Sequence, residues 1–452
     1  MKADNLIIGA GIIGLQLARK LQQDGQSVIL IDQQAPGMGC SYGNAGILAF
    51  EEIIPLARSE TLMALPQMML DGLSPLSLNK RAIMANAPWF MKFTLAAKRK
   101  QVIRGTRTLA NMMMAGTKSW HNTIENEGLS QHFKTNGLLR VFESNDQFYS
   151  EEGDRNTQQL EGVELDLLNP DEVRALNPHL TRTIKHGVLY KNSMHCLNPL
   201  AVSQQLFQNF MLAGGTFVKA PVSGFDKNPD NGAHYRFRAL MDGPAGLLAP
   251  SNRMEKWNVA ETDQFITDHL TQLNQDIGII AQNLIITAGR ASDSLLAPFG
   301  VSLPLMSERG YHQMLNGQHL DGFDIPISSA ERGFLTTPMA NGIRLAGTVE
   351  FTRPAFPPYW NRAALLGKQV TDLFPDLKIM DQPEQWFGDR PTLPDYLPAL
   401  GAIPHHKGLF VATGHQHLGL TLSAVSADLM LGLIKQDAAP FELSALDPMR
   451  YS

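Results

Sequence analysis

The feature that most constrains the fold of this chain is the segment 5–32, which reads NLIIGAGIIGLQLARKLQQDGQSVILID. A short apolar run leads into Gly9, Gly11 and Gly14, and apolar residues then recur at the spacing of a helix. A second apolar run follows and ends at Asp32. The pattern predicts a strand, a glycine-rich turn, a helix and a second strand, the unit that binds the pyrophosphate of a dinucleotide.

Each of these residues has a task if a dinucleotide binds. Gly9 allows the tight turn, Gly11 lets the backbone approach the pyrophosphate, and Gly14 lets the helix pack closely on the strand. The N-terminus of the helix offers unpaired N–H groups to the phosphates. Asp32 accepts the ribose hydroxyls and disfavours the 2′-phosphate of NADP, so FAD and NAD remain. The alternative is a plain strand–helix–strand unit whose glycines only shape a turn.

Composition excludes several classes of protein. The 452 residues are enough for roughly two or three domains. A net charge of -5 argues against nucleic acid as a partner. No apolar run is long enough to predict a transmembrane helix, and no cluster of Cys and His predicts a metal site. The two cysteines, Cys40 and Cys196, do not make a disulfide framework and suit a reducing cytoplasm.

The rest of the chain predicts an α/β protein whose nucleotide-binding domain is assembled from separated segments. Further buried strands are predicted at 216–218, 283–287 and 409–413, and helices over 58–127, 200–213 and 418–435. Residues 301–351 alternate short strands and turns, as an antiparallel sheet does, whereas residues 242–275 have no clear period. The expected fold is a Rossmann-type FAD-binding domain with an interleaved, mostly antiparallel β substrate domain that carries helices. The expected boundaries are 1–50, 165–300 and 385–452 for the FAD-binding domain, and 51–164 and 301–384 for the substrate-binding domain.

Five segments together resemble the FAD-dependent amino-acid oxidoreductase superfamily of D-amino-acid oxidase and glycine oxidase. They are the N-terminal fingerprint, 39–46 (GCSYGNAG), 286–289 (ITAG), 388–391 with 394–395 (GDRP and PD), and 414–421 (GHQHLGLT). The resemblance covers nearly the whole chain and looks closest to the small subunit of bacterial D-amino-acid dehydrogenase and its hydroxyproline-type relatives.

The resemblance implies FAD, bound without a covalent link, and a small carboxylate-bearing amine or imino acid as substrate. The implied reaction is the oxidation of the Cα–N bond of a D-amino or cyclic D-imino acid, such as D-hydroxyproline or D-proline, by hydride transfer to flavin N5. Electrons then pass to an acceptor such as a quinone. The alternatives are an amine oxidase of the sarcosine or glycine oxidase type, and a flavoprotein subunit that is inactive without a partner subunit.

The expected location is the cytoplasm, with peripheral contact at the inner face of the membrane as an addition. A basic run, Lys98, Arg99 and Lys100 with Arg104 and Arg107, is usually a solvated helix face but also suits weak docking on a membrane.

Two glycine-rich segments are expected to hold the cofactor. In the loop 39–46, backbone N–H groups and the side chains of Ser41 and Asn44 would hold pyrophosphate and flavin, unless the glycines only satisfy positive φ. The segment 414–421 enters a helix, and its free N–H groups would stabilise negative charge at the pyrimidine edge of the flavin. The full set of expected cofactor-binding residues is Gly9, Gly11, Ile12, Ile13, Gly14, Asp32, Gln33, Gly39, Cys40, Ser41, Asn44, Ala45, Gly46, Val222, Ala288, Gly289, Gly388, Arg390, Gly414, His415, His417, Leu418, Gly419, Leu420 and Thr421.

The expected catalytic residues are Arg390, Tyr311, His312 and Arg332. The planar fork of Arg390 would bind the substrate carboxylate, unless it pairs with a neighbouring acid or contacts the flavin. Several oxidase relatives carry a carboxylate-binding arginine after a proline in the preceding sheet, where this chain has Met339. Help is therefore expected from Arg332 or Tyr311, although a sheet tyrosine is equally often structural.

Overall fold

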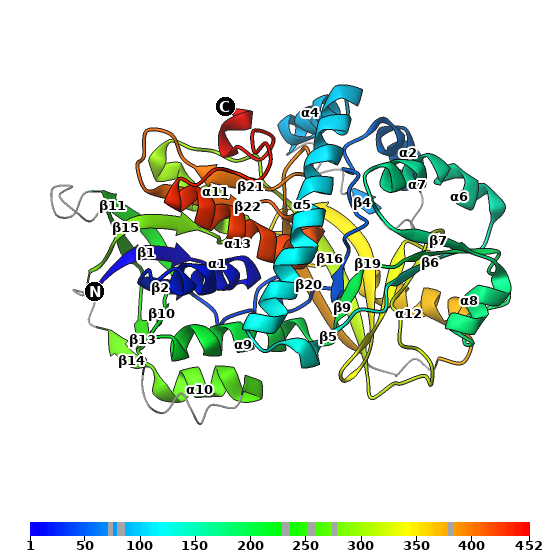
Figure 1. Ribbon diagram of the computed structural model, residues 1–452, viewed down its shortest axis with the longest axis horizontal. Helices are drawn as coiled ribbons and strands as arrows, with labels where there is room; N and C mark the ends of the chain where they lie inside the picture. The colour runs from blue at the N-terminus through cyan, green and yellow to red at the C-terminus, as the bar shows by residue number, and fades with distance from the viewer. Residues whose placement is uncertain (71–75, 79–85, 228–235, 251–258, 274–277, 378–382) are drawn as a thin grey trace.

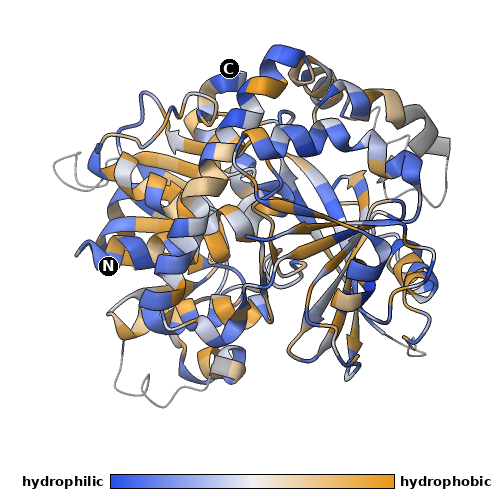
Figure 2. Ribbon diagram, turned by 45° about the vertical axis from the view of Figure 1, so that its right-hand side comes forward, coloured by the Kyte–Doolittle hydropathy of each residue, from blue (hydrophilic) through white to orange (hydrophobic). Residues whose placement is uncertain are grey.

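The computed structural model describes residues 1–70, 76–78, 86–227, 236–250, 259–273, 278–377 and 383–452. Two large sheets, each with its own helices, lie next to each other, and the long helix α5 (Arg99–Asn126) runs along their junction (Figure 1). Apolar residues concentrate in the strands of both sheets and on the helix faces against them (Figure 2). This architecture confirms the predicted fold class.

The first sheet is ten-stranded and has a parallel centre, in the path β11-β12-β15-β1-β2-β10-β13-β14, with β22 beside β15 and β21 beside β22. Its strands are β1 (Lys2–Ile8), β2 (Val28–Asp32), β10 (Thr216–Lys219), β11 (Val222–Lys227), β12 (Phe237–Met241), β13 (Ala245–Leu248), β14 (Thr271–Leu273), β15 (Ile279–Ile286), β21 (Ala399–Ala402) and β22 (Leu409–Thr413). Ile8 is paired with Ile31 on one side and with Ile286 on the other. The carboxyl ends of these three parallel strands therefore meet at one edge, where ligands bind in such sheets.

Helix α1 (Ile12–Gln23) packs on this sheet because Gly14 has no side chain. A Cβ on Gly14 would lie 2.0 Å from the carbonyl oxygen of Gly9 and 2.7 Å from Oγ1 of Thr287. The helix buries Leu15 and Leu17 and packs against α13 (Gly419–Lys435). Gly14 thus allows the close packing of helix on strand that the sequence predicts.

The second sheet is nine-stranded and mostly antiparallel, in the path β20-β16-β19-β18-β17-β6-β8-β7, with β4 beside β19. Its strands are β4 (Leu76–Leu78), β6 (Leu138–Phe142), β7 (Leu165–Leu168), β8 (His186–Tyr190), β16 (Met306–Asn316), β17 (Ile327–Ser329), β18 (Phe334–Met339), β19 (Gly342–Thr352) and β20 (Glu384–Thr392). A small third sheet joins β3 (Ile47–Leu48), β9 (Met194–Cys196) and β5 (Phe133–Lys134).

Strand pairing differs from the expected segment boundaries at two places. Residues 165–190 were expected in the FAD-binding domain, but β7 and β8 pair with each other and β8 pairs with β6 of the second sheet. Strand β20 pairs with β16 over its whole length, so the second sheet extends to Thr392 rather than ending at 384. Short strands carry no periodicity that distinguishes the two sheets, because the sheet is chosen by partners distant in sequence.

The helices cover the outer faces of both sheets. They are α1, α2 (Ser59–Leu70), α4 (Ala87–Ala96), α5, α6 (Asn145–Ser150), α7 (Glu152–Leu160), α8 (Pro170–Leu176), α9 (Pro199–Leu212), α10 (Thr262–His269), α11 (Ser292–Leu296), α12 (Asn361–Leu373) and α13. The segment 242–275, which has no clear period, adds β13, α10 and β14 to the edge of the first sheet beside β10. Its residues 251–258 and 274–275 lie outside the described residues.

Residues Gln416–Lys435 form one stretch of helix that is long and apolar enough, by length and composition alone, to cross a membrane. This stretch includes α13, which packs between α1 and α5, and 61% of its apolar window is buried. Packing inside the protein therefore accounts for its apolar composition. The sequence had predicted no such helix because polar residues interrupt the apolar run.

Trp120 should contribute measurably to the stability of the fold. Its fully buried indole Nε1–H on α5 donates to the carbonyl oxygens of Leu420 and Thr421 in the first turn of α13, at 3.2 and 3.0 Å. Trp120→Phe should lower the free energy of unfolding by about 1–3 kcal/mol, measured by urea denaturation, because both acceptors lose a buried donor. Tyr149→Phe is the control, since Tyr149 is 60% exposed; equal stability of the two variants would contradict this role.

Candidate active site

A cavity of about 1380 Å³ lies between the two large sheets. It is lined by the carboxyl ends of β1, β2 and β15, the loop 39–46, the start of α13, and strands β16 to β20. Ligand pockets usually have volumes of roughly 300–1,000 Å³. This cavity is therefore large enough for a dinucleotide together with a small substrate.

At the first sheet, the cavity has the shape that a pyrophosphate needs. Gly9 has a φ of +113°, and a Cβ there would lie 2.6 Å from the carbonyl oxygen of Thr287. A Cβ on Gly11 would meet only Oγ of Ser41, at 3.4 Å, and that hydroxyl accepts a hydrogen bond from the amide of Ile12 at 3.0 Å. The backbone at Gly11 is thus open to a ligand, as the fingerprint predicts.

Asp32 lies at the end of β2 and lines the cavity. Its Oδ2 accepts a hydrogen bond from the amide of Ala10 at 2.7 Å, and its Oδ1 accepts one from the amide of Gln34 at 2.9 Å. Burial raises the pKa of this carboxyl group, and these amide hydrogen bonds act in the opposite direction. Each carboxylate oxygen keeps a free lone pair, so Asp32 can also accept from the hydroxyls of a ribose.

The loop 39–46 is held in place by the second sheet. Nη1 of Arg344 on β19 donates to the carbonyl oxygen of Asn44 at 2.6 Å. A ring nitrogen of His312 on β16 lies 3.1 Å from the carbonyl oxygen of Gly43, and Trp386 packs so closely on Gly43 that a Cβ would lie 2.1 Å from its ring. These contacts fix the position of the loop against β16, β19 and β20.

The entry to α13 is also fixed by buried hydrogen bonds. Nε2 of His415 lies 2.9 Å from Oγ of Ser426, and burial lowers the pKa of His415 to about 3. Gln416, with a φ of +46°, donates to the carbonyl oxygen of Tyr396 at 2.6 Å. His415 is therefore a neutral structural side chain at neutral pH.

Arg390 reaches the cavity from β20. A Cβ on Gly310 would lie 2.2 Å from Nη2 of Arg390, so the guanidinium lies directly against the β16 backbone. Its nearest acidic partner is Glu308, whose Oε1 is 3.9 Å from Nη1, beyond hydrogen-bond distance. Among the described residues, the guanidinium of Arg390 donates no hydrogen bond, which leaves its N–H groups available to a ligand in the cavity.

The two neighbouring acids that could have neutralised Arg390 have other partners. Asp389 pairs with Arg309 at 2.8 Å, and Asp395 pairs with Arg450 at 2.7 Å. The structural alternative for Arg390 is therefore removed, and its contact with substrate or flavin stays a prediction.

The structure does not place the other three expected catalytic residues in the cavity wall. The hydroxyl of Tyr311 donates to Glu350 at 2.6 Å and accepts from the amide of Tyr359. His312 is 1% exposed and stacks on Trp386. These two side chains are occupied by protein partners, so their expected role at the substrate is corrected to a structural one.

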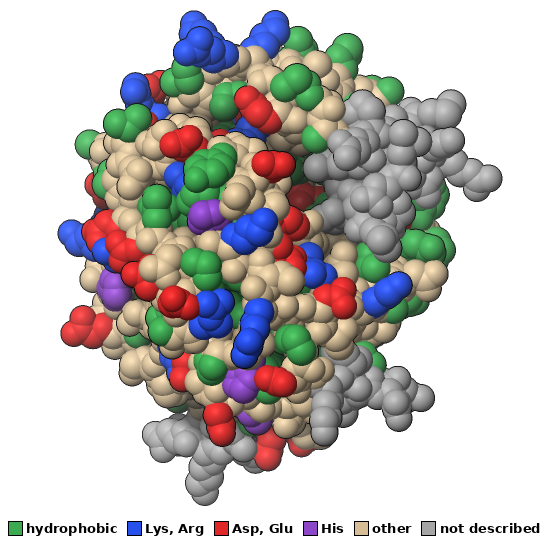
Figure 3. Space-filling view, turned by 90° about the vertical axis from the view of Figure 1, so that its right-hand side faces the viewer, with side chains coloured by type: hydrophobic (Ala, Val, Ile, Leu, Met, Phe, Trp, Pro, Cys, Tyr) green, Lys and Arg blue, Asp and Glu red, His purple; other side chains and the backbone are tan. Residues whose placement is uncertain are grey.

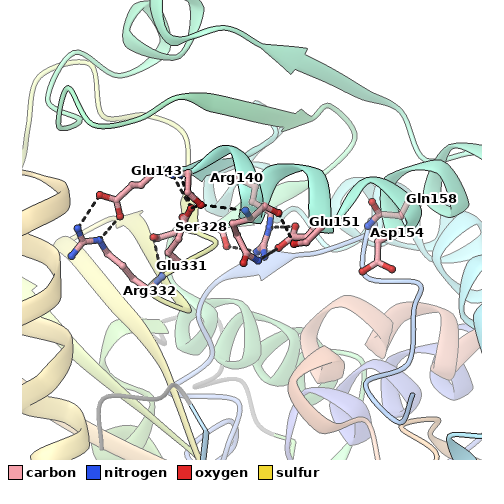
Figure 4. Close-up of polar contacts among 12 residues, drawn as sticks. Arg140, Glu143, Glu151, Asp154, Gln158, Ser328, Glu331 and Arg332 are labelled. Carbon is pink, nitrogen blue, oxygen red and sulfur yellow. Dashed lines mark hydrogen bonds and ion pairs between the residues drawn. The ribbon is translucent and has the colours of Figure 1, made fainter. Parts of the chain in front are cut away.

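Arg332 is corrected for the same reason. Its guanidinium forms a two-pronged ion pair with Glu143 and a further hydrogen bond to Asp372. Figure 4 shows this pair, with the neighbouring Glu331 accepting hydrogen bonds from the amides of Glu143 and Ser144. Arg332 thus joins β6 to the turn before β18.

Most of the expected cofactor-binding residues line the cavity, and four glycines lie behind it. A Cβ on Gly46 would lie 2.6 Å from the carbonyl oxygen of Cys196, and one on Gly414 would lie 2.5 Å from Leu393. Gly388 lies against the ring of Trp386, and Gly14 packs helix α1 as described. These four shape the wall rather than face a ligand. The cavity-lining residues of the expected set are Gly9, Gly11, Ile12, Ile13, Asp32, Gln33, Gly39, Cys40, Ser41, Asn44, Ala45, Val222, Ala288, Gly289, Arg390, His415, His417, Leu418, Gly419, Leu420 and Thr421.

Sequence reasoning missed the polar far wall of the cavity. Arg140 on β6 donates twice to Glu151, at 2.8 and 2.7 Å, and once to Ser328 at 3.1 Å (Figure 4). Nearby, Arg58 pairs with Asp154 at 2.6 Å. No motif marks these residues, since they come from separate strands and helices.

The far wall is distant from Arg390 along the sheet. Five strand steps, β20-β16-β19-β18-β17-β6, separate the two arginines, which is roughly 24 Å along the sheet. A small amino acid held by Arg390 therefore does not reach Arg140.

On the outer face over this part of the molecule, Lys and Arg side chains alternate with Asp and Glu (Figure 3). Across the described residues, no group of three or more His, Cys, Asp or Glu could hold a metal ion.

Comparison with known families identifies the class of protein. The family described as "FAD dependent oxidoreductase" (DAO) matches residues 4–433. The chain therefore belongs to this family of FAD-dependent oxidoreductases, and the predictions of an oxidoreductase and of FAD as cofactor are confirmed.

Curated relatives match over nearly the whole chain. A D-amino-acid oxidase of Bradyrhizobium diazoefficiens is 28% identical over 98% of each sequence. A D-amino acid dehydrogenase of Dechloromonas aromatica is 24% identical over 95% of this chain and 96% of its own length.

Solved structures share the fold at lower identity. Glycine oxidase from Geobacillus kaustophilus has a TM-score of 0.69 and 18% identity, covering 99% of both chains. L-proline dehydrogenase from P. horikoshii has a TM-score of 0.69 and 15% identity, covering 100% of this chain and 98% of its own. The FAD-bound L-alpha-glycerophosphate oxidase of Mycoplasma pneumoniae has a TM-score of 0.67 and 16% identity, covering 98% and 97%.

Three buried histidines should make stability fall as the solution becomes acidic. Burial lowers the pKa of His312 and His415 to about 3 and that of His195 to about 4. Each folded-state pKa lies below the unfolded value of roughly 6.5, so protons bind preferentially to the unfolded chain as pH falls through that value. Glu51 acts in the opposite direction, because burial raises its pKa to about 8.

The net free energy of unfolding should fall on the order of 3 kcal/mol between pH 7 and pH 5. Urea denaturation at several pH values measures it. His195→Gln is the informative variant, since His195 lies outside the cavity wall; it should remove about 2 kcal/mol of that loss. A stability curve that is flat between pH 7 and pH 5 would show that these histidines stay accessible to protons in the folded protein.

Proposed function

We propose that this chain is an FAD-dependent dehydrogenase of small D-amino acids or cyclic D-imino acids, with D-proline and D-hydroxyproline as the first candidates. The observation that carries the proposal is Arg390, a cavity-lining guanidinium that donates no hydrogen bond to the described residues. A substrate carboxylate would take up those donors in a two-pronged contact. The names of the curated relatives, D-amino-acid oxidase and D-amino acid dehydrogenase, support the same substrate class.

The residues of the chain divide the work between two ends of the cavity. Gly9, Gly11 and Asp32 would hold the diphosphate and ribose of FAD, and the loop 39–46 with the start of α13 would hold its flavin. When bound, FAD supplies the acceptor for the hydride that leaves the α-carbon of the substrate. Arg390 would orient that carbon, so orientation would supply much of the rate.

Arg390 rather than the far-wall arginine is proposed to take the carboxylate. Gly310 and Gly388 let the side chains of Arg390 and Trp386 lie close to the strands, whereas Arg140 already donates to Glu151 and Ser328. A quinone or protein carrier is proposed as the electron acceptor rather than oxygen.

Anaerobic addition of substrate should bleach the flavin absorbance of the purified protein. D-Proline, cis-4-hydroxy-D-proline and D-alanine form the first panel, with the L-enantiomers as controls. Faster reduction by sarcosine or glycine, with oxygen uptake, would favour an oxidase of that type. A yellow protein that no amine reduces would contradict the proposal and favour a subunit that needs a partner.

Arg390→Lys should weaken carboxylate substrates because a lysine cannot make the two-pronged contact. The Michaelis constant should rise on the order of 10- to 100-fold, with the FAD content unchanged. Arg332→Lys is the matched control, since Arg332 lies outside the cavity wall. Equal kinetics of wild type and Arg390→Lys would remove Arg390 from the substrate site.

A further inference from the structure

Glu308 is a buried carboxylate in the cavity wall, directly beside Arg390. The two residues are paired across β16 and β20, so their side chains project from the same face of the sheet. Glu308 is 3% exposed, and its Oε2 accepts a hydrogen bond from Oγ1 of Thr392 at 2.7 Å. Its Oε1 is 3.9 Å from Nη1 of Arg390, too far for a hydrogen bond. One oxygen of Glu308 is therefore uncommitted.

A second group near Glu308 is also uncommitted. The hydroxyl of Tyr396 is buried close to Glu308 and makes no hydrogen bond of ordinary geometry to the described residues. Burial, and then the nearby charge of Glu308, raise the pKa of Tyr396 well above its usual value, so the phenol stays protonated. The hydroxyl of Thr392 thus stabilises the charge of Glu308 through Oε2, and the protonated phenol of Tyr396 lies close enough to Glu308 to act in the same direction.

Arg390 and Glu308 together match the two charges of an α-amino acid. Such a substrate carries a carboxylate and an ammonium group on one carbon, so the two charges are close neighbours. A guanidinium with free donors and a carboxylate with a free oxygen stand at a similar spacing in the cavity wall. An ammonium group that leaves water for this cavity needs such an acceptor, because burying an unpaired charge is costly.

We propose that Glu308 binds the amino group of the substrate through Oε1 while Arg390 holds the carboxylate, and that Glu308 accepts a proton from the ammonium group. One N–H bond breaks, its electron pair stays on nitrogen, and the proton moves to Oε1. The amine that results has the free electron pair that its oxidation to an imine requires. The assignment rests on the proposed function and extends it to the group that handles the proton.

Two other titratable groups of the cavity wall are less suited to this role. His415 is held at Ser426, and burial keeps it neutral. Glu151 accepts both donors of Arg140 and lies at the far wall, roughly 24 Å from Arg390 along the sheet.

The test compares a substrate with its amine-free counterpart in the FAD-loaded protein. D-Proline and cyclopentanecarboxylate share the ring and the carboxylate, and D-alanine and propionate form a second pair. Equilibrium binding of the carboxylates is measured from the change in flavin absorbance, and that of the amino acids from the concentration dependence of anaerobic flavin reduction. Glu308→Gln keeps the shape of the side chain and an acceptor for Thr392.

Glu308→Gln should weaken the binding of the amino acid on the order of 10- to 100-fold at pH 7. Binding of the amine-free carboxylate should be unchanged or tighter, because a negative charge near Arg390 is removed. The defect should shrink as pH rises above the pKa of the substrate ammonium group, since the amine then arrives neutral. Glu350→Gln changes a buried carboxylate of the same sheet that lies outside the cavity wall. It should leave unchanged the binding of the amino acid, the binding of the amine-free carboxylate and the pH dependence of both.

An equal loss of affinity for both members of a pair, at every pH, would overturn the proposal and make Glu308 a residue that only positions Arg390. Unchanged binding of the amino acid would overturn it as well. The failure of the proposed function is distinguishable, because the wild-type protein itself would then be reduced by no amino acid.

Discussion

The arrangement of the site depends on the hydrogen bonds by which the second sheet holds the loop 39–46. The loop follows the nucleotide-binding unit directly, yet its carbonyl oxygens at Gly43 and Asn44 are held by His312 and Arg344, which come from strands some three hundred residues later. The same sheet carries Arg390 and Glu308. One sheet therefore positions both the cofactor loop and the charged groups that face the substrate. The distance and orientation between the loop and these charged groups are set by the same strands.

The parts of the fold that sequence could predict are those whose physics is local. The turn at Gly9 and the close packing of Gly14 follow from steric limits within a few residues, and both are present in the structure. Residues 165–190 carry no comparable signal, because whether β8 joins the first or the second sheet depends on its pairing with β6. For the same reason the pairing of β20 with β16 could not be placed from its own residues.

In the site, too, the sequence gives the type of a residue but not the partners that surround it. Arg332, Arg140 and Arg390 look alike in the sequence, but the first makes a two-pronged ion pair with Glu143 and the second with Glu151. Only the third, among these three, keeps its donors free, and that difference depends on acids that are contributed by other elements. The sequence could identify Arg390 as part of a motif. The structure was needed to show that its neighbours Asp389 and Asp395 form ion pairs with Arg309 and Arg450.

The titratable side chains near Arg390 decide which group can accept a proton from the substrate. Burial lowers the pKa of His312 and of His415 to about 3, so both are neutral at neutral pH, and Nδ1 of His312 and Nε2 of His415 are held at Gly43 and Ser426. Neither of these two imidazoles is therefore suited to act as a base at Arg390. A buried carboxylate beside a guanidinium suits an arriving zwitterion, since each member can face one charge of the ligand. Specificity for amino acids over simple carboxylates would follow from that pairing rather than from the shape of the cavity alone.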